Sequence, residues 1–283
     1  MAHRDFILGG GITGRTVQHF FPEAIMLEER SPEDAVKLRV FNYGTNYLWK
    51  DLDGFKTSPI DILTHVDGKP ATEEGIIRYK TKVRQDHLDR SSWAAQFAEH
   101  QTGYSILEYP EPRETWFGCR VTYVDLDKQK LHFLKSGRSS VFKFRYLIST
   151  IPLIAFTEMT KLSQLIPVRT YLRYAPIYVS TVPSNSHTVS ENEIYVNYVS
   201  NPMTDVYRTC IRNKEEHSES LLPLPNYAKK IFPGKIYDHP VAEEILKIVK
   251  KSGVHCFGRF GCWNSNELVH QTYERIQQWK QTL

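Results

Sequence analysis

The most constraining feature of the chain is a glycine-rich turn at residues 9–14, whose letters G-G-G-I-T-G match the pattern G-x-G-x-x-G. A short apolar run, Asp5–Leu8, precedes the turn, and apolar residues at helical spacing follow it from Thr13 to Phe21. A second apolar run, Ala24–Leu27, completes a strand-turn-helix-strand unit. In such a unit the glycines allow a tight turn, close approach of the backbone to a pyrophosphate, and close packing of the helix on the strand. The pattern predicts a dinucleotide-binding β-α-β unit, and a purely structural glycine turn is the alternative.

An acidic residue ends the second strand of this unit. Glu28 follows Gly14 by 14 residues, where a carboxylate can accept hydrogen bonds from adenosine ribose hydroxyls. The neighbouring Glu29 is a second candidate for the same role. An acid at this place disfavours a cofactor with a 2′-phosphate. The turn and the acid alone leave NAD and FAD equally open.

Composition indicates a globular protein without a membrane segment. The chain has 283 residues, 41% of them hydrophobic and 24% charged, which suits one large domain or two intergrown ones. No apolar run reaches the roughly 18 residues that a bilayer span needs, and no signal-like start is present, so we expect a cytoplasmic location. The net charge of +4 permits a polyanionic partner without requiring one. The four cysteines show no C-x-x-C or zinc spacing, so we expect buried thiols and no metal site: Cys119, Cys210, Cys256 and Cys262.

The pattern along the rest of the chain predicts a mixed α/β protein. After a loop-rich stretch, Phe41–Asp67, we expect a helix at His87–His100, then a hairpin of Arg120–Asp125 with Lys130–Leu134, and a strand at Phe142–Ser149. Beyond Pro152 the sequence predicts three antiparallel strands, a Pro-rich connector, a helix, a strand and a last helix: Ile177–Val182, Ile194–Val199, Val206–Ile211, Leu222–Pro240, Val241–Lys251, Val254–Phe257 and the segment from Glu267 to the end.

Three segments in order resemble one family, the FAD enzymes of the amine oxidase and UDP-galactopyranose mutase group. Residues 27–30 (L-E-E-R) resemble the family's L-E-x-R, and residues 146–153 (Y-L-I-S-T-I-P-L) resemble its strand ending in S-T-x-P-L. Residues 257–263 (F-G-R-F-G-C-W), followed by Glu267 and Leu268, resemble its closing G-R-x-G-x-[YW] segment. The resemblance touches the start, middle and end of the chain, so it implies FAD as the cofactor.

The resemblance implies a fold and a division of the chain. The fold class is α/β, with a Rossmann-like FAD-binding domain that carries an inserted β-meander, and a smaller antiparallel-sheet substrate domain. The FAD-binding domain would comprise residues 1–152, with an insertion at about 41–100, and residues 241–283. The substrate domain would comprise residues 153–240.

The resemblance also assigns cofactor residues, position by position. The ADP half would be held near the turn, the adenine against the first hairpin strand, the pyrophosphate and ribityl chain near the closing segment, and the isoalloxazine near the loop at residues 43–46 (Y-G-T-N). That loop has an equally good interpretation as an ordinary aromatic loop. The cofactor candidates are Gly9, Gly11, Ile12, Thr13, Gly14, Glu28, Glu29, Thr45, Val121, Thr150, Arg259, Glu267 and Leu268.

The substrate side is marked by arginines and tyrosines. The period of two in Val206–Arg212 places Arg208 and Arg212 on one face of a strand, where they could grip a phosphate, although solvent-facing arginines explain the pattern equally well. Tyr207 and, near the predicted flavin, Asn46 are further substrate-side candidates. A set of tyrosines suits either stacking on a ring or an ordinary sheet core: Tyr171, Tyr174, Tyr178, Tyr195 and Tyr198.

The resemblance supports three hypotheses for function. The first is an FAD-dependent oxidoreductase or lyase that oxidises a C–N bond of a bulky amine, with an aminoacyl-modified thymidine in phage DNA as one candidate substrate. The second is a nucleotide-sugar mutase of the UDP-galactopyranose type that uses reduced flavin. The third is a non-catalytic protein with the FAD fold. No Ser-His-Asp arrangement or Walker loop is present, which fits chemistry carried by a cofactor.

Overall fold

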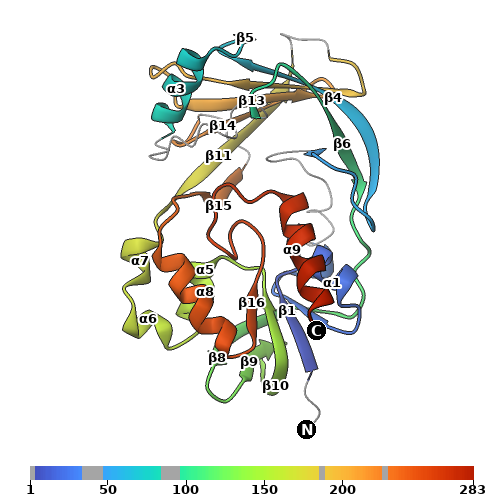
Figure 1. The fold of residues 1–283 in the computed structure, drawn as a ribbon, viewed down its shortest axis with the longest axis vertical. Coiled ribbons are helices and arrows are strands. Elements are labelled where there is room, and N and C mark those ends of the chain that lie inside the picture. The colour runs from blue at the N-terminus through green and yellow to red at the C-terminus, as the bar shows by residue number, and fades with distance from the viewer. Residues whose placement is uncertain (1–3, 34–46, 84–95, 185–188, 225–228) are drawn as a thin grey trace.

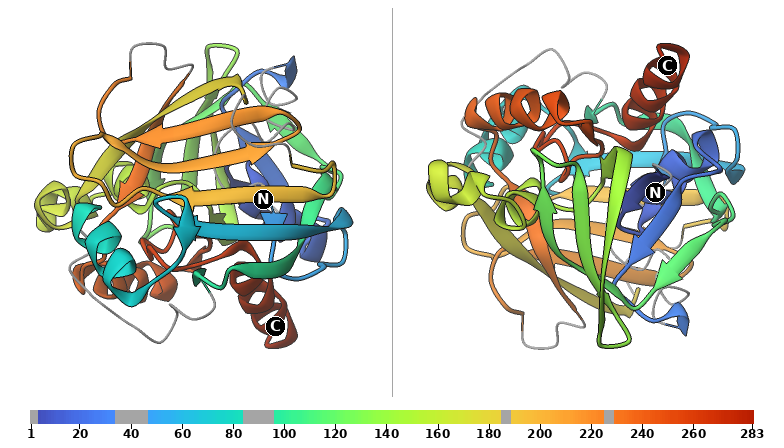
Figure 2. Two further views of the ribbon diagram at one scale, coloured as in Figure 1. Left: turned by 90° about the horizontal axis from the view of Figure 1, so that it is seen from above. Right: turned by 90° about the horizontal axis from the view of Figure 1, so that it is seen from below.

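The structure is a computed structural model of the chain and describes residues 4–33, 47–83, 96–184, 189–224 and 229–283. Two sheets dominate it, a partly parallel sheet at one end and a curled sheet at the other (Figure 1). Figure 2 shows the curled sheet from above and the partly parallel sheet from below. In the described part of the chain, no helix is both long and apolar enough to cross a membrane.

The partly parallel sheet has seven strands among the described residues. In spatial order they are β7 (Thr115–Phe117), β2 (Ile25–Glu28), β1 (Arg4–Leu8), β10 (Arg138–Ser149), β9 (Lys130–Lys135) and β8 (Cys119–Asp125), and β16 (Val254–Cys256) pairs with β10. The pairs that join β7, β2, β1, β10 and β16 are parallel. Their carboxyl ends therefore meet at one edge, which points toward the curled sheet (Figure 1).

Alternation along β1 decides which helices cover which face of this sheet. Ile7 packs with Val17 of α1 (Ile12–Phe20) and Ile276 of α9 (Val269–Gln281). Phe6 and Leu8 point to the other face, because successive side chains of a strand alternate. That second face is covered by short helices and by the longer α8: α5 (Leu153–Glu158), α6 (Leu162–Leu165), α7 (Val168–Tyr171) and α8 (Val241–Lys251).

The β-meander is a continuation of the same sheet. The first part of β10 pairs antiparallel with β9, which pairs antiparallel with β8. The second part of β10, Leu147–Ser149, pairs parallel with both β1 and β16. This long strand thus joins the hairpin to the dinucleotide unit.

The curled sheet has nine strands among the described residues. In spatial order they are β15 (Lys229–Ile236), β11 (Tyr174–Pro183), β14 (Glu215–Ser220), β13 (Val206–Arg212), β12 (Glu193–Tyr198), β4 (Lys56–Val66), β6 (His100–Glu108) and β3 (Tyr47–Leu48), and β5 (Lys69–Pro70) pairs with β4. All pairs are antiparallel except β12 with β4.

The helix α3 (Glu73–Lys82) packs on the curled sheet. It begins after Thr72, whose hydroxyl accepts a hydrogen bond from the Gly75 N–H and so caps the helix. Ile76 and Tyr79 face the sheet and pack against Val66 and Tyr198 in one core cluster. This packing brings α3, from the first third of the chain, against β12, from the last third.

Most of the predicted elements are confirmed. The dinucleotide unit, the hairpin, the three strands beyond Pro152, the helix Val241–Lys251, the strand at Val254 and the last helix lie within a few residues of the prediction. The mixed α/β fold with a parallel sheet and a largely antiparallel one is the predicted class. The four cysteines are buried thiols, as expected. The domain boundaries stay predictions.

Two predicted segments were incomplete, and a third lies mostly outside the described residues. The predicted loop-rich stretch contains the eleven-residue β4, whose Ile60 and Ile62 point inward on alternate positions. The predicted Pro-rich connector contains β15. Proline and glycine in these segments favour loops, but both residues are tolerated in strands at edge and bulge positions. The predicted helix His87–His100 lies mostly outside the described residues, and His100 begins β6.

Candidate functional site

The glycine turn adopts a conformation that requires glycine at two places. Gly9 has φ +97°, in the left-handed region that favours glycine, and its N–H donates to the Leu27 carbonyl at 3.0 Å. A Cβ atom on Gly14 would lie 1.9 Å from the Gly9 carbonyl oxygen. Only glycine therefore allows α1 to pack this closely on β1.

Gly11 is different, because the space beside it is open. A Cβ atom on Gly11 would meet no described heavy atom within 4 Å, and its φ of −71° suits any residue. Gly11 is also the N-cap of α1, and no side chain caps this helix end. The first N–H groups of a helix lack intrahelical partners and attract anions, so Ile12 and Thr13 present donors to this open space. The turn forms a cradle that fits a phosphate.

Glu28 lies beside the turn and is buried. Its carboxylate accepts hydrogen bonds from the Gly10 N–H at 2.7 Å and from the Arg30 N–H at 2.9 Å. The Arg30 guanidinium adds two more at 2.7 and 2.9 Å. Burial alone would raise the pKa of Glu28, but Arg30 outweighs it and lowers this pKa. Since Arg30 is 42% exposed, its side chain can move aside for a ribose hydroxyl.

The resemblance implies that the adenine lies against the first hairpin strand, β8. Glu29 is 68% exposed and lies 3.6 Å from Arg120 of β8, in a surface ion pair. Val121, the next residue of β8, is half-buried and packs on the core cluster under the sheet. The structure thus brings β8 to the end of β2, with Glu28 turned inward and Glu29 outward.

Thr150 supports the turn from the neighbouring strand. Its hydroxyl donates to the Leu8 carbonyl at 2.7 Å, and a Cβ atom on Gly9 would lie 2.9 Å from this hydroxyl oxygen. Arg15, which the sequence analysis did not single out, is buried in α1 and donates from Nε to the Gly10 carbonyl at 3.4 Å. Both side chains stabilise the backbone that surrounds the cradle.

The closing segment returns to the same turn. Gly258 has φ +82°, and a Cβ atom on it would lie 2.6 Å from the Thr13 hydroxyl oxygen. Arg259 follows directly. Its Nε is buried and makes no hydrogen bond with the described residues. Burial and the charge of Arg208 lower the pKa of Arg259. The last part of the chain thus contributes to a site that the first residues begin.

Glu267 and Leu268 lie at the start of α9. The Glu267 carboxylate accepts from Thr272 at 2.8 Å and from Arg275 at 2.6 Å, while its Oε2 is buried without a hydrogen bond among the described residues. Leu268 is exposed. Glu267 lines an open groove of about 900 Å³ between α8 and α9, on the side of Cys262.

Arg208 and Tyr207 share one acidic partner. The Arg208 guanidinium pairs with Glu219 at 2.5 and 3.1 Å, and the Tyr207 hydroxyl donates to the same carboxylate at 2.7 Å. The register of β13 and β14 shifts between Val206 and Arg208, and such a bulge turns adjacent side chains toward the same partner. Burial lowers the pKa of Arg208, but Glu219 outweighs it and raises this pKa well above its usual range.

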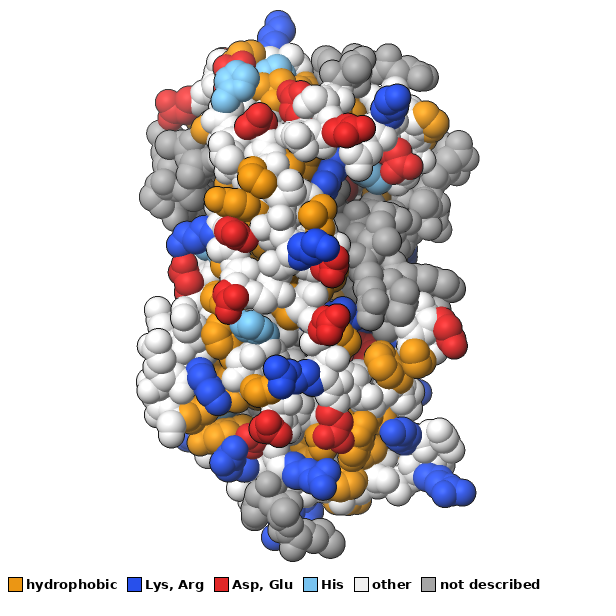
Figure 3. Space-filling view, turned by 90° about the vertical axis from the view of Figure 1, so that its right-hand side faces the viewer, with side chains coloured by type: hydrophobic (Ala, Val, Ile, Leu, Met, Phe, Trp, Pro, Cys, Tyr) orange, Lys and Arg blue, Asp and Glu red, His pale blue; other side chains and the backbone are white. Residues whose placement is uncertain are grey.

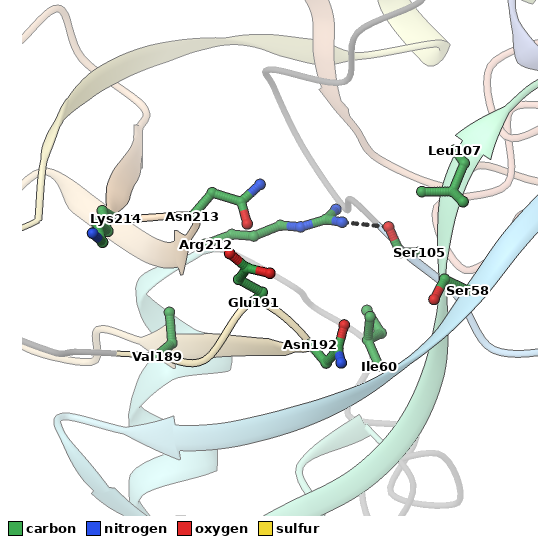
Figure 4. Close-up of a pocket in the computed structure, with 10 residues that line it drawn as sticks. All are labelled: Ser58, Ile60, Ser105, Leu107, Val189, Glu191, Asn192, Arg212, Asn213 and Lys214. Carbon is green, nitrogen blue, oxygen red and sulfur yellow. Dashed lines mark hydrogen bonds between the residues drawn. The ribbon is translucent and has the colours of Figure 1, made fainter.

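The two arginines of β13 have different partners. Arg212 donates to the Ser105 hydroxyl and lines a pocket of about 390 Å³, together with side chains such as Ser58 and Asn192 (Figure 4). Arg208 is not among the residues that line this pocket. The register of β13 is unbroken from Arg208 to Arg212, so the two arginines share a strand face, as the period of two predicts. They lie four residues apart along the strand, and each therefore has its own surroundings.

Two buried lysines of the site were missed by the sequence analysis. Lys235 of β15 and Lys80 of α3 are 7% and 8% exposed. Burial, the charge of Arg259 and the charge of Lys80 lower the pKa of Lys235 to about 7. Burial lowers the pKa of Lys80 to about 8. Proline and glycine next to Lys235 favoured a connector over a strand in the sequence analysis. The one sequence signal for a buried lysine at this position was its place inside an apolar run.

The remaining candidates divide into core residues and residues outside the description. Tyr195 and Tyr198 are buried in the sheet, as the core interpretation expects, whereas Tyr171 is exposed. Tyr174 packs on Trp263. Thr45 and Asn46 lie outside the described residues.

Comparison with known proteins shows similarity of fold without similarity of sequence. No protein-family model matches the chain, and no curated protein matches it. A solved structure of reduced UDP-galactopyranose mutase is similar over 100% of this chain and 95% of its own, with a TM-score of 0.61 and 12% identity. A CLA-producing fatty acid isomerase from P. acnes is similar over 99% of this chain and 98% of its own, with a TM-score of 0.59 and 11% identity. These similarities establish the fold and confirm the predicted fold class.

Proposed function

We propose that this protein is an FAD-dependent enzyme that binds the pyrophosphate of FAD at the turn of residues 9–14. The observation that carries the proposal is the cradle at Gly11, where open space meets the uncapped N-terminus of α1. Glu28 lies beside it for the ribose, and Gly258 brings the closing segment against Thr13. The fold that the chain shares with UDP-galactopyranose mutase supports the same cofactor.

A pair of glycine substitutions tests the cofactor proposal. Gly11→Ala adds a methyl group to open space, so the unfolding free energy should stay within about 1 kcal/mol of wild type. FAD affinity, measured by quenching of flavin fluorescence, should fall by about tenfold or more, because the methyl group occupies the place of the phosphate. Gly14→Ala is the contrasting variant, since its methyl group would collide with the Gly9 carbonyl and destabilise the fold itself.

Two results would contradict the proposal. The first is a wild-type protein that takes up no FAD on reconstitution and is purified colourless, which would favour the non-catalytic alternative. The second is a Gly11→Ala variant that binds FAD as tightly as wild type. In that case the cradle would be only a structural turn.

For the reaction, we propose oxidation of a C–N bond in an amine substrate. Bound FAD would supply a two-electron acceptor for a hydride from the carbon beside the nitrogen, and water would hydrolyse the resulting imine. Loss of the flavin's visible absorbance on anaerobic addition of an amine tests the reaction, and no change with any amine would exclude it.

For the substrate, we propose an aminoacyl-modified thymidine, as found in phage DNA. The outer face shown in Figure 3 carries acidic and basic side chains interspersed, with no continuous basic surface among its described residues. The described residues on this side of the molecule offer no basic surface for a duplex, and we propose that the modified nucleotide itself is recognised on the side of the curled sheet that faces the turn of residues 9–14. A modified thymidine should bleach the flavin faster than free amino acids or polyamines do.

A nucleotide-sugar mutase is the second candidate. The observation in its favour is Arg259, which directly follows the close approach of Gly258 to Thr13 and whose Nε is buried without a hydrogen bond among the described residues. A sugar diphosphate would suit this guanidinium. Turnover of a nucleoside-diphosphate sugar by the reduced protein only, without net oxidation, would identify this activity. Failure of such sugars to shift the flavin spectrum would exclude it.

A further inference from the structure

Four cationic side chains come from elements that meet where the loop after β16 reaches the curled sheet: Lys80 of α3, Arg208 of β13, Lys235 of β15 and Arg259 of the loop. The Lys235 amine donates to the Val83 carbonyl, at the end of α3, and the Trp263 indole donates to the Tyr237 carbonyl, directly after β15, at 3.1 Å. Lys80 and Lys235 are buried, and the Nε of Arg259 is buried as well. Like charges that approach one another away from water destabilise a fold unless counter-ions are present.

Two acidic side chains act on this cluster, and both already have partners. Glu219 pairs with Arg208 at 2.5 Å and accepts the Tyr207 hydroxyl at 2.7 Å. Asp238, the other acid whose charge acts on Arg259, accepts the backbone N–H and the hydroxyl of Ser265. Neither carboxylate makes an ion pair with Arg259 within the described residues.

Lys235 also lacks an acidic partner among the described residues. Its amine donates to the backbone carbonyl of Val83, and the charges that act on it are those of Arg259 and Lys80. Lys80 in turn donates to the Gln96 side chain at 2.9 Å and lies over the ring of Phe97. A neutral amide and a carbonyl satisfy hydrogen bonds without balancing charge, so within the described residues no carboxylate pairs with Lys235 or Arg259.

We propose that Arg259 and Lys235 form a binding site for an oxyanion, the carboxylate or phosphate of the substrate. This inference rests on the proposed function, because Gly258 places Arg259 one residue from the contact with Thr13 and hence beside the cofactor cradle. An oxyanion here would accept a hydrogen bond from Nε of Arg259, which has no partner among the described residues, and would balance the charges of Arg259 and Lys235. The substrate is thus expected to carry an acidic group, as an aminoacyl or nucleotide substituent does.

Anion binding to the purified full chain tests this site. Inorganic phosphate and acetate, compared with chloride at equal ionic strength, should raise the thermal midpoint of the wild-type protein in a saturable way. Lys235→Met removes one cation and retains much of the apolar stem, so the protein should fold, while half-saturation should need about tenfold more phosphate. Lys230→Met on the same strand is the matched control, because Lys230 is exposed, and its phosphate dependence should equal that of wild type.

The same titration with FAD separates the two sources of an oxyanion. If the site serves the substrate, phosphate should still stabilise the FAD-loaded protein, and Lys235→Met should bind FAD as tightly as wild type. If FAD abolishes the phosphate effect and Lys235→Met weakens FAD binding by the same factor, the site belongs to the cofactor pyrophosphate and the inference is overturned. No saturable anion effect in wild type would also overturn it, whether or not FAD binds. Anion binding without FAD uptake would support the site and reject the flavin proposal.

Discussion

The carboxylate of Glu219 is the single acid that both Arg208 and Tyr207 contact inside the curled sheet. Glu219→Gln keeps the shape of this buried side chain but leaves the largely buried Arg208 guanidinium, whose side chain is 22% exposed, without its counter-ion. Removing one partner of a buried ion pair typically destabilises a protein by about 3–5 kcal/mol. We expect a loss of that order in the free energy of unfolding, measured by urea denaturation of the apoprotein.

Two comparisons make this prediction specific. Glu215→Gln lies on the same strand, but its side chain is 60% exposed, so the variant should lose less than about 1 kcal/mol. Replacing both Arg208 and Glu219 by Met should restore much of the stability lost in Glu219→Gln, because no unpaired charge remains. Equal urea midpoints for Glu219→Gln and Glu215→Gln would show that the buried pair does not stabilise the sheet.

At the level of elements, β15 depends on a glycine for its pairing with β11. A Cβ atom on Gly234 would lie 2.5 Å from the backbone nitrogen of Ile177, near the register shift between Ala175 and Ile177. We expect Gly234→Ala to lower the free energy of unfolding by about 1–3 kcal/mol through overpacking. The movement of β15 in this variant should also displace Lys235. The increase in thermal midpoint that phosphate produces should therefore be smaller than in wild type, and the urea midpoint should be lower.

Gly11→Ala provides the control for the pairing of β15, because it makes the same chemical change where no described atom lies within 4 Å. Its urea midpoint should stay close to that of wild type. A Gly234→Ala variant that is as stable as Gly11→Ala would mean that β15 tolerates a side chain at this position, and the close approach to Ile177 would lose its significance.

The elements that the sequence predicted well are those whose signals are local. The turn at residues 9–14 could be predicted from the sequence, because the glycine spacing, the preceding strand and the following helix all occur within about 25 residues. The partner of Arg208 could not be predicted in this way. Its acid lies on β14, which had no recognised pattern, and a bulge that no local rule announces directs Tyr207 and Arg208 to the same carboxylate. Lys235 was missed because Pro233 and Gly234 resemble a connector.

At the scale of the whole molecule, the candidate site is assembled from distant parts of the chain. The cradle comes from the first strand and helix, Arg259 from the last loop, and the other cations from α3 and the curled sheet. Sequence motifs predicted both ends of this arrangement. They could not predict that α3 brings Lys80 near Lys235, because that contact depends on how two sheets and a helix pack together.

The charge of Lys235 should make the stability of the apoprotein depend on pH. Its pKa is about 7 in the fold, whereas a lysine in an unfolded chain has a pKa of about 10.4. Between these values the unfolded chain binds more protons, so the free energy of unfolding should rise as pH increases, by up to about 1.4 kcal/mol per pH unit. Lys235→Met lacks this proton, and its stability should rise less over the same range.

The measurement is a series of urea denaturations of wild type and Lys235→Met from about pH 7 to about pH 10. Lys80, with a pKa of about 8, titrates in both proteins, so its own contribution largely cancels in the difference between them, which reports Lys235 and its coupling to Lys80. That difference should grow with pH in favour of wild type and level off above the pKa of an unfolded lysine. A constant difference would mean that Lys235 is fully protonated in the fold up to pH 10. The pKa of Lys235 would then be unperturbed, and its amine would not lie in the buried, positively charged surroundings that the proposed oxyanion site requires.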